Sequence, residues 1–347
     1  MTSATPDLAA RVVRWQSVHG RHHLPWQNTR DPYRVWLSEI MLQQTQVTTV
    51  LDYFARFLAR FPNVHALAAA SQDDVLALWS GLGYYSRARN LHACAQHVVA
   101  RHQGFFPRNA ITLATLPGIG RSTAGAIASL CFGERVAILD GNVKRVLTRV
   151  LGFESDLATA SNERALWDRA SELLPNENLE STMPRYTQGM MDLGATVCLA
   201  RKPLCLVCPL SEVCVAGQAG TAEHYPVKSR KLKRSSESLW LLWAQTLEGD
   251  IYLQKRPTPG VWAGLYCFPL FDRPEALAMT IPPRYRTQMR DDPAFKHVLT
   301  HKDLHLHPVR IQLPAGGLED LDGAWIAATR WAALGLPAPI RKLLSQA

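Results

Sequence analysis

The stretch LPGIGRSTAGAIASLCFGERVAILDGNVKR, Leu116 to Arg145, predicts two helices joined by a tight turn. Pro117 stops the first helix, and Gly118 and Gly120 permit the positive φ and close backbone approach that such a turn requires. The second helix is expected to begin at Arg121, and the unpaired backbone N–H groups of its first turn can hold a phosphate. The stretch therefore predicts a phosphate-binding helical hairpin.

The second helix of this hairpin carries small side chains that allow close packing against a neighbour: Ala124, Gly125, Ala126 and Ala128. After Gly133, the apolar run 136–139 leads to Asp140, at the start of a further helix expected over 143–150. Two interpretations of Asp140 are open. It is an N-cap of that helix, or a carboxylate placed for chemistry near a bound phosphate.

The length of 347 residues allows two or three domains, and the net charge of +9 favours a polyanionic partner such as nucleic acid. No apolar run approaches the roughly 20 residues that span a bilayer. The N-terminus also lacks a signal-peptide pattern, so a cytoplasmic protein without a membrane partner is expected. A heptad seam is missing, and we therefore expect a monomer.

Apolar residues at helical spacing predict an amphipathic helix over 8–18, followed by a basic loop that carries Trp26. Trp26 is interpreted either as a buried anchor of the loop or as an exposed ring that contacts a base. From Tyr33 to Phe61 the apolar pattern predicts one long helix or two.

Glu39 lies between Trp36 and Ile40 in this helical region. Burial beside apolar side chains would raise the pKa of its carboxyl and suit it to donate a proton near neutral pH. The alternative is an ordinary surface glutamate on the polar stripe of the helix. The amides that follow are able to contact base edges or phosphates: Gln43, Gln44 and Gln46.

A Gly-containing turn, GLGYYSRARNL at 81–91, follows a short helix that Asp74 is expected to cap and that runs to Trp79. Apolar and aromatic side chains at its tip stand before two arginines: Leu82, Tyr84, Tyr85, Arg87 and Arg89. Proteins unstack a duplex with wedges of this kind. Tyrosines in a turn also serve as core anchors, and that alternative is open.

Four of the seven cysteines crowd into one segment with six, two and five intervening residues: Cys198, Cys205, Cys208 and Cys214. Zinc sites usually pair two short knuckles, whereas here one short pair is flanked by two wider cysteines. The spacing favours an iron–sulfur centre and leaves zinc open. The other three, Cys94, Cys131 and Cys267, are interpreted as buried thiols.

After Pro226 the chain becomes basic and serine-rich, VKSRKLKRSSES, which predicts a linker over 227–236. Beyond it, SLWLLWAQT, DIYLQKR and DLHLHPVRIQL are typical of strands, and the tail 330–346 is expected to be partly helical. The region is interpreted as a small α+β domain. Its histidines fall partly in a strand pattern, so a nucleic-acid-contacting loop is favoured over a metal site: His297, His301, His305 and His307.

The segments LPGIGRSTAGA, LDGNVKRV, VWLSEIMLQQTQV, GLGYYSRARNL and the four-cysteine loop together resemble the helix-hairpin-helix iron–sulfur DNA glycosylases, and within them the MutY-type adenine DNA glycosylases. The resemblance runs from about Val13 to Pro226 and is looser beyond. It implies a mainly α catalytic region, 1–226, and one 4Fe-4S cluster on the four cysteines. A six-helix module would cover 27–135, and the cluster lobe would combine 1–26 with 136–226. The domain 237–347 would be Nudix-like and read the lesion.

This resemblance implies excision of adenine paired with 8-oxoguanine, and with guanine, from double-stranded DNA by N-glycosidic hydrolysis in base excision repair. Glu39 would protonate the purine ring and then activate water, while Asp140 would stay ionised and stabilise the sugar cation. Because Asp140 lies at the N-terminus of a helix that carries Lys144 and Arg145, its carboxylate is expected to stay charged. In a bacterium the enzyme would be associated with the nucleoid.

Further positions match the wedge into the duplex (Gln44, Leu82 and Tyr84), the surroundings of the flipped adenine (Trp26, Asn142 and Gln188) and the phosphate-binding turn (Gly118 and Gly120). In the second domain Leu299, Thr300 and His301 stand where the family has a Phe-Ser-His loop that inspects 8-oxoguanine. Thr300 keeps a hydroxyl, but Leu299 lacks the ring. The Nudix glutamate-rich box is missing from the sequence, so no pyrophosphatase activity is expected.

Ser122 stands where endonuclease III-type enzymes carry a lysine that forms a Schiff base with the sugar. The missing amine predicts a monofunctional glycosylase. Two alternatives are an endonuclease III-like bifunctional glycosylase for oxidised pyrimidines and a non-catalytic iron–sulfur DNA-binding protein. Carboxyls at both Glu39 and Asp140 argue against the non-catalytic alternative.

Overall fold

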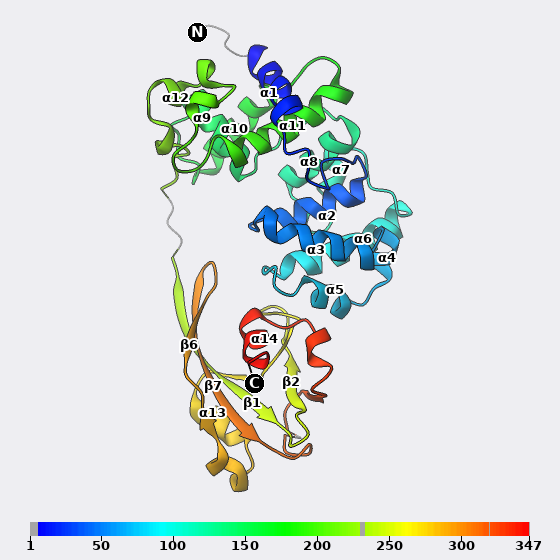
Figure 1. Ribbon diagram of the computed structural model, residues 1–347, viewed down its shortest axis with the longest axis vertical. Coiled ribbons are helices and arrows are strands. Elements are labelled where there is room, and N and C mark those ends of the chain that lie inside the picture. Colours follow the sequence, from blue (N-terminus) through cyan, green and yellow to red (C-terminus); the bar gives the residue numbers. More distant parts are fainter. Residues whose placement is uncertain (1–5, 230–232, 319, 347) are drawn as a thin grey trace. The chain divides into compact units, whose positions relative to one another are not determined.

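The computed structural model describes residues 6–229, 233–318 and 320–346, and the chain in these ranges forms two compact units (Figure 1). The first unit comprises residues 6–68 and 93–229, and the second comprises 69–92 and 233–346. Within the described ranges no helix combines the length and apolarity needed to cross a membrane.

The first unit is helical. Its helices are α1 (Pro6–His19), α2 (Pro32–Leu42), α3 (Val47–Arg60), α4 (Val64–Ala69), α7 (Ala110–Leu113), α8 (Arg121–Phe132), α9 (Gly141–Leu151), α10 (Ala160–Glu172), α11 (Leu179–Thr196) and α12 (Val215–Gln218), with 3-10 turns η1 (Cys205–Val207), η2 (Ser211–Val213) and η3 (Ala222–His224). Helix α6 (Ser86–His102) begins in the second unit and ends in the first.

Two helices, rather than one, occupy the region 33–61. Helix α2 begins at Pro32, where the Tyr33 N–H donates to the Asp31 carboxylate at 2.9 Å. The chain leaves the helical conformation after Leu42, and Gln44 takes a φ of +57° before α3 begins. The break places Glu39 in the last turn of α2, with Trp36 and Ile40 buried on either side.

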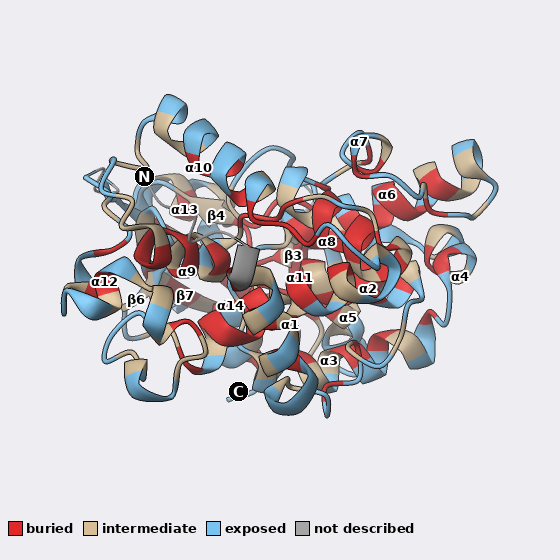
Figure 2. Ribbon diagram, turned by 90° about the horizontal axis from the view of Figure 1, so that it is seen from above, coloured by how far each residue is buried: buried red, intermediate tan, exposed pale blue. Residues whose placement is uncertain are grey.

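The predicted hairpin is present. A turn with Gly118 at a φ of +73° leads into α8, which begins at Arg121 as expected and ends at Phe132, with Gly133 as its C-cap. A Cβ on Gly125 would lie 2.6 Å from the Ala137 carbonyl oxygen, so only glycine lets α8 approach the run that leads to Asp140. Most of α8 and half of α11 are buried (Figure 2), and the run that leads to Asp140 belongs to the same hydrophobic core.

The second unit contains a mixed sheet. Its strands are β1 (Ser235–Gln245), β2 (Ile251–Lys255), β3 (Tyr266–Cys267), β4 (Leu270–Phe271), β5 (Arg290–Asp291), β6 (Phe295–Val298), β7 (Lys302–Gln312) and β8 (Ala324–Ile326), and its helices are α5 (Gln72–Trp79), α13 (Pro274–Thr280), η4 (Pro283–Gln288), η5 (Trp331–Ala333) and α14 (Ala338–Leu344). The main strand order is β3-β2-β1-β7-β5. Strands β1 and β7 run parallel, and β6 folds back antiparallel on β7 to present the turn 299–301.

Helix α5 and the turn after it pack on the C-terminal strands of their own unit. Asp73 forms an ion pair with Lys255 at 2.6 Å, and the Tyr85 hydroxyl donates to the Leu336 carbonyl at 3.0 Å. The predicted cap of α5 is wrong: Ser71 is the N-cap, because its hydroxyl accepts from the Asp74 N–H. Asp74 lies inside the first turn of the helix instead.

The stretch 227–236, expected as a linker, is described only in part. Residues 230–232 lie outside the described residues. Strand β1 begins at Ser235, so the last two residues of the expected linker, 235 and 236, already belong to the sheet.

Candidate active site

Glu39 is held in α2 between side chains that exclude water. Trp36 is 0% exposed and Ile40 is 3% exposed. Burial and, to a smaller extent, the negative charge of Asp140 together raise the pKa of Glu39 to about 8. Glu39 therefore carries a proton at neutral pH and can act as an acid.

Asp140 is the N-cap of α9, and its carboxylate accepts from the Val143 N–H at 2.7 Å. Burial raises its pKa, while hydrogen bonds from the backbone of Val143 and Asn142 and the positive charges of Arg145 and Lys144 lower it. The expectation of a setting that only favours the charged form was therefore incomplete, since burial opposes it. The cap and the chemical interpretations of Asp140 are compatible, because the cap contact with Val143 uses only Oδ1 of the carboxylate.

The two carboxyls interact and differ in their surroundings. Both influences on Glu39 raise its pKa, whereas the influences on Asp140 oppose one another. The charge of an ionised Asp140 contributes to the raised pKa of Glu39, so the two states that favour each other are a protonated Glu39 and an ionised Asp140. A protonated acid and a nearby anion are the pair that cleavage of a glycosidic bond requires.

A cavity of about 120 Å³ in the first unit brings together two of the residues predicted to surround the flipped base. Trp26 and Gln188 line it, together with Val35, one helical turn before Glu39 on the same face of α2. Trp26 is 6% exposed, so it is a buried anchor of the loop and a wall of the cavity at once. Asn142 is engaged elsewhere, where its side-chain oxygen accepts from Arg145 Nη2 at 2.8 Å.

Three residues near this cavity were not predicted from the sequence: Arg21, Gln27 and Asp192. Asp192 is 0% exposed and accepts from Arg21 and from Gln27, which itself lines the cavity. The one available signal was the spacing of Gln188 and Asp192, which places them on one face of α11.

The glycine turn and Ser122 lie beside the segment that carries Asp140. Gly118 and Gly120 are exposed, and Gly120 is the N-cap of α8 without a side chain to cover the first-turn N–H groups. The Ser122 hydroxyl accepts from the Leu139 N–H at 3.0 Å. Ser122 thus supports the backbone next to Asp140, in addition to lacking an amine.

The three predicted wedge residues differ in exposure. Gln44 is exposed in the first unit, at the break between α2 and α3. Tyr84 is 44% exposed in the second unit and takes a φ of +47°, whereas Leu82 is only 5% exposed. Tyr84 is therefore the side chain that this turn presents to solvent, while Leu82 would have to leave its packing to enter a duplex.

The turn 299–301 lies next to Tyr84 in the second unit. The Tyr84 and Thr300 hydroxyls form a hydrogen bond at 2.7 Å, and both residues line a cavity of about 660 Å³ together with Leu299 and His301. Arg234 holds the turn by donating to the Leu299 and Thr300 carbonyls at 2.9 and 3.1 Å. Trp262 was not foreseen from the sequence, and it forms a further wall of this cavity.

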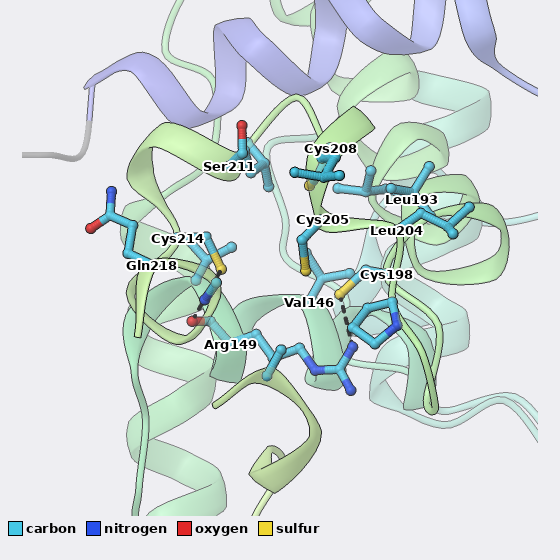
Figure 3. A pocket seen from close by; sticks show the side chains of 17 residues that line it. Val146, Arg149, Leu193, Cys198, Leu204, Cys205, Cys208, Ser211, Cys214 and Gln218 are labelled. Atoms are coloured by element: carbon cyan, nitrogen blue, oxygen red, sulfur yellow. Dashed lines mark hydrogen bonds between the residues drawn. The ribbon is translucent and has the colours of Figure 1, made fainter. Parts of the chain in front are cut away.

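The four clustered cysteines line one cavity of about 260 Å³ at the end of α11 (Figure 3). Four thiolates around a single zinc ion form a compact site with zinc–sulfur distances of about 2.3 Å, whereas a 4Fe-4S cluster occupies more space. The cavity suits a larger iron–sulfur cluster, to which the four thiolates would be ligands. Hydrogen bonds are donated to these sulfurs from the protein: Gly217 N–H donates to Cys214 and Arg149 Nη1 donates to Cys198, both at 3.3 Å.

Arg149→Met is expected to shorten the lifetime of a bound cluster severalfold. Arg149 is 1% exposed, and besides Cys198 it donates to the Leu199 and Ala200 carbonyls, so its loss frees the segment that carries the first ligand. The decay of the absorbance at about 400 nm under air measures this. Arg169→Met, at an exposed position on α10, is the matched control. Equal decay in both variants would refute a role for Arg149 at the cluster.

Family models match three parts of the chain. Residues 37–172 match the HhH-GPD superfamily base excision DNA repair proteins, 198–214 match the iron–sulfur binding domain of endonuclease III, and 240–346 match the NUDIX domain. The candidate carboxyls, the four cysteines and the turn 299–301 fall in these three regions respectively.

Curated relatives match this chain over different lengths, one of them over nearly the whole chain. An adenine DNA glycosylase of Buchnera aphidicola subsp. Acyrthosiphon pisum is 38% identical over 338 residues, covering 96% of this chain and 95% of the relative. The adenine DNA glycosylase of Mus musculus is 45% identical over 219 residues, covering 60% of this chain and 41% of the relative.

Among solved structures, a thermostable thymine-DNA glycosylase has a TM-score of 0.53 at 28% identity, covering 61% of this chain and 95% of its own. A non-covalent endonuclease III–DNA complex has a TM-score of 0.50 at 22% identity, covering 61% of this chain and 94% of that chain. The second likeness concerns the fold alone.

Proposed function

The chain belongs to the adenine DNA glycosylase family, and from this premise we propose that it excises adenine paired with 8-oxoguanine, and more slowly adenine paired with guanine. Members of the family are base excision repair enzymes that hydrolyse N-glycosidic bonds in DNA, and the cofactor of this chain is one 4Fe-4S cluster. The observation that carries the catalytic part is the pair of interacting carboxyls with different surroundings, Glu39 and Asp140.

In the proposed reaction the protonated Glu39 gives its proton to a ring nitrogen of the extrahelical adenine. The bond between the sugar C1′ and the base nitrogen breaks, and its electron pair leaves with the adenine. The ionised Asp140 stabilises the positive charge that develops on the sugar. Water then attacks C1′ and returns a proton to the Glu39 carboxylate, which restores the starting state.

The cluster has a structural part in this scheme. When bound, it would cross-link the loop between α11 and α12 through Cys198, Cys205, Cys208 and Cys214. Arg145 joins this region to the start of α9, because it donates to the Cys198 carbonyl at 2.8 Å and to the Asn142 side chain.

The proposal limits the chemistry to base removal by a single copy of the chain. Ser122 provides no amine for a Schiff base, and its hydroxyl already accepts from the Leu139 N–H. The Lys144 ammonium, the nearest lysine in sequence to Asp140, forms an ion pair with Glu163. Both observations support a monofunctional enzyme.

Single-turnover cleavage of duplexes that contain adenine opposite 8-oxoguanine, guanine or thymine tests the activity, with borohydride trapping in parallel. We expect adenine release in the order 8-oxoguanine, then guanine, and no efficient covalent adduct. A further duplex that contains thymine glycol tests the endonuclease III-like alternative, which release of thymine glycol with adenine left intact would identify. Binding to these duplexes without release of any base would identify the non-catalytic one.

The lesion-reading part of the proposal is supported by the cavity of about 660 Å³ that Tyr84 and Thr300 share. 8-Oxoguanine differs from guanine by an N–H at ring position 7 and a carbonyl at position 8. A hydroxyl is able to accept a hydrogen bond from this N–H or donate one to this carbonyl. The Thr300 hydroxyl is already hydrogen-bonded to the hydroxyl of Tyr84, which is exposed at the tip of the turn 81–91.

Thr300→Val is expected to lower the preference for adenine opposite 8-oxoguanine over adenine opposite guanine by about fivefold, the worth of one hydrogen bond. The substitution keeps the shape of the side chain and removes only its hydroxyl. The ratio of the two single-turnover rates measures the effect, and Thr280→Val on α13, outside the cavity, is the control. An unchanged ratio in Thr300→Val would exclude the hydroxyl from lesion reading.

A further inference from the structure

The turn between β6 and β7 is held along its backbone by two consecutive residues where β1 begins. Arg234 Nη2 donates to the Leu299 carbonyl at 2.9 Å, and Arg234 Nη1 donates to the Thr300 carbonyl at 3.1 Å. The Ser235 N–H donates to the His301 carbonyl at 3.0 Å. Each of the three carbonyls of the turn therefore accepts a hydrogen bond from the segment that follows the linker.

Arg234 is itself anchored by a carboxylate on the far side of the turn. Its guanidinium forms an ion pair with Asp303 on β7, and Lys296 on β6 pairs with the same carboxylate at 2.5 Å. Hydrogen bonds from Lys296 and Arg234 lower the pKa of Asp303, so this carboxylate stays ionised at neutral pH. Arg234 is thus joined to both strands that carry the turn, to β7 directly and to β6 through the shared carboxylate.

A guanidinium suits this place because its N–H donors lie in one rigid plane and meet several acceptors at once. Arg234 does not line the cavity of about 660 Å³, whereas Leu299, Thr300 and His301 do. Arg234 therefore acts on a base in this cavity by way of the turn. Thr300 is held from two sides, by Arg234 at its carbonyl and by Tyr84 at its hydroxyl.

We propose that Arg234 is a positioning residue for lesion reading, which fixes the backbone of the turn so that the Thr300 hydroxyl is in place before DNA binds. The inference rests on the proposed function and extends it from the residues that line the cavity to one that presets their geometry. A turn that had to become ordered on binding would lose part of the interaction with the base to the cost of ordering.

Arg234→Met in the full-length protein tests this role. Methionine keeps an apolar stem and removes every donor, and the arginine side chain is 41% exposed, so the core is left intact. We expect the ratio of single-turnover rates, adenine opposite 8-oxoguanine over adenine opposite guanine, to fall about fivefold, the worth of one hydrogen bond. Arg273→Met, which removes an exposed arginine paired with Asp272, is the matched control and should keep the native ratio.

Arg234→Lys separates positioning from a direct attraction of the positive charge to DNA. Lysine keeps the charge but ends in a single ammonium, which does not reproduce the planar fork. The rate ratio should therefore fall in Arg234→Lys as it does in Arg234→Met. The affinity of Arg234→Lys for an undamaged duplex should stay within about twofold of the native value, because the charge is kept. A native ratio in Arg234→Lys would show that charge alone matters and would overturn the inference.

A double variant that combines Arg234→Met with Thr300→Val tests whether Arg234 acts through the Thr300 hydroxyl. A positioning residue has no further effect once the group that it positions is gone, so the double variant should have the same rate ratio as Thr300→Val alone. Effects that multiply would show two independent contributions, and the inference would then be wrong.

The outcomes separate this inference from the proposed function. A native protein without any preference for 8-oxoguanine would overturn the proposed lesion reading and the inference with it. A native preference that Arg234→Met retains would overturn the inference alone. Thermal unfolding shows whether each variant is folded, and if Arg234→Met is not, the ratio in Arg234→Lys decides. A reduced ratio in both variants that Thr300→Val does not reduce further supports the inference.

Discussion

Replacing Glu39 by glutamine is expected to lower the single-turnover rate of adenine release by a factor on the order of 10² to 10⁴, the usual contribution of a general acid. Glutamine fills the same space between Trp36 and Ile40 but has no proton to transfer to the purine. DNA affinity should change little, since the group is partly buried and uncharged when protonated. A variant with near-native rates would refute the role of Glu39 as the acid.

The same residue predicts the pH dependence of the reaction. Adenine release needs Glu39 in its protonated form, and burial raises the pKa of this carboxyl to about 8. The rate should therefore hold up to neutral pH and fall about tenfold per pH unit above pH 8. A rate that continues to rise through pH 9 would mean that another group supplies the proton.

Thermal unfolding gives an independent check on this pKa. The ordinary pKa of a glutamate is about 4.3, so the unfolded chain releases the Glu39 proton at lower pH than the folded chain does. The stabilising contribution of the protonated carboxyl is complete below that value and is lost as the pH rises through about 8. Between about pH 4.3 and pH 8 the native protein should therefore lose stability relative to Glu39→Gln. Parallel curves of unfolding temperature against pH for the two proteins would show that the pKa of the carboxyl is not shifted.

Asp140→Asn is expected to lower the rate of adenine release by a factor on the order of 10² to 10³, because it removes the anion that stabilises the sugar cation. This variant separates the chemical role of Asp140 from its structural role as the N-cap of α9. Asparagine caps helices as well as aspartate does, so the variant should unfold at nearly the native temperature. A rate within a few fold of the native one would leave Asp140 as a cap alone.

Asp140→Ala completes this comparison. Alanine cannot accept from the Val143 N–H, so this variant should lose about 1 kcal/mol of stability in addition to its activity. The rates of the asparagine and alanine variants should be equally low, while their unfolding temperatures should differ. If activity follows stability across the two variants, the chemical role assigned to the carboxylate is wrong.

The local part of the fold follows from the sequence. Glycine turns, apolar periodicity and an N-cap aspartate act over a few residues, and they placed the start of α8 at Arg121 and Asp140 at the mouth of α9. The adenine DNA glycosylase family and the iron–sulfur centre were also predictable, since motifs such as the cysteine spacing reach along one short segment.

The contacts that orient the site depend on pairs far apart in the chain. Asp192 meets residues from the loop after α1, 171 positions away for Arg21, and Tyr84 meets Thr300 across 216 positions. No periodicity links such positions, because the helices and strands between them determine whether they meet. The burial of Leu82 was unpredictable for the same reason, since it depends on how its turn packs within the second unit.

The C-terminal strands form one compact unit with a segment from the first hundred residues of the chain. Residues 69–92 precede most of the helical unit in the chain, yet they fold with the strands after 232, where Arg89 donates to the Ala263 carbonyl and Gly335 lies against Leu76. Truncation after residue 229 would strip the exposed tyrosine turn of its support and uncover apolar surface on α5. A gene fusion, a shortened splice form or a limited proteolytic digest that separates the two halves of this unit would damage both of them.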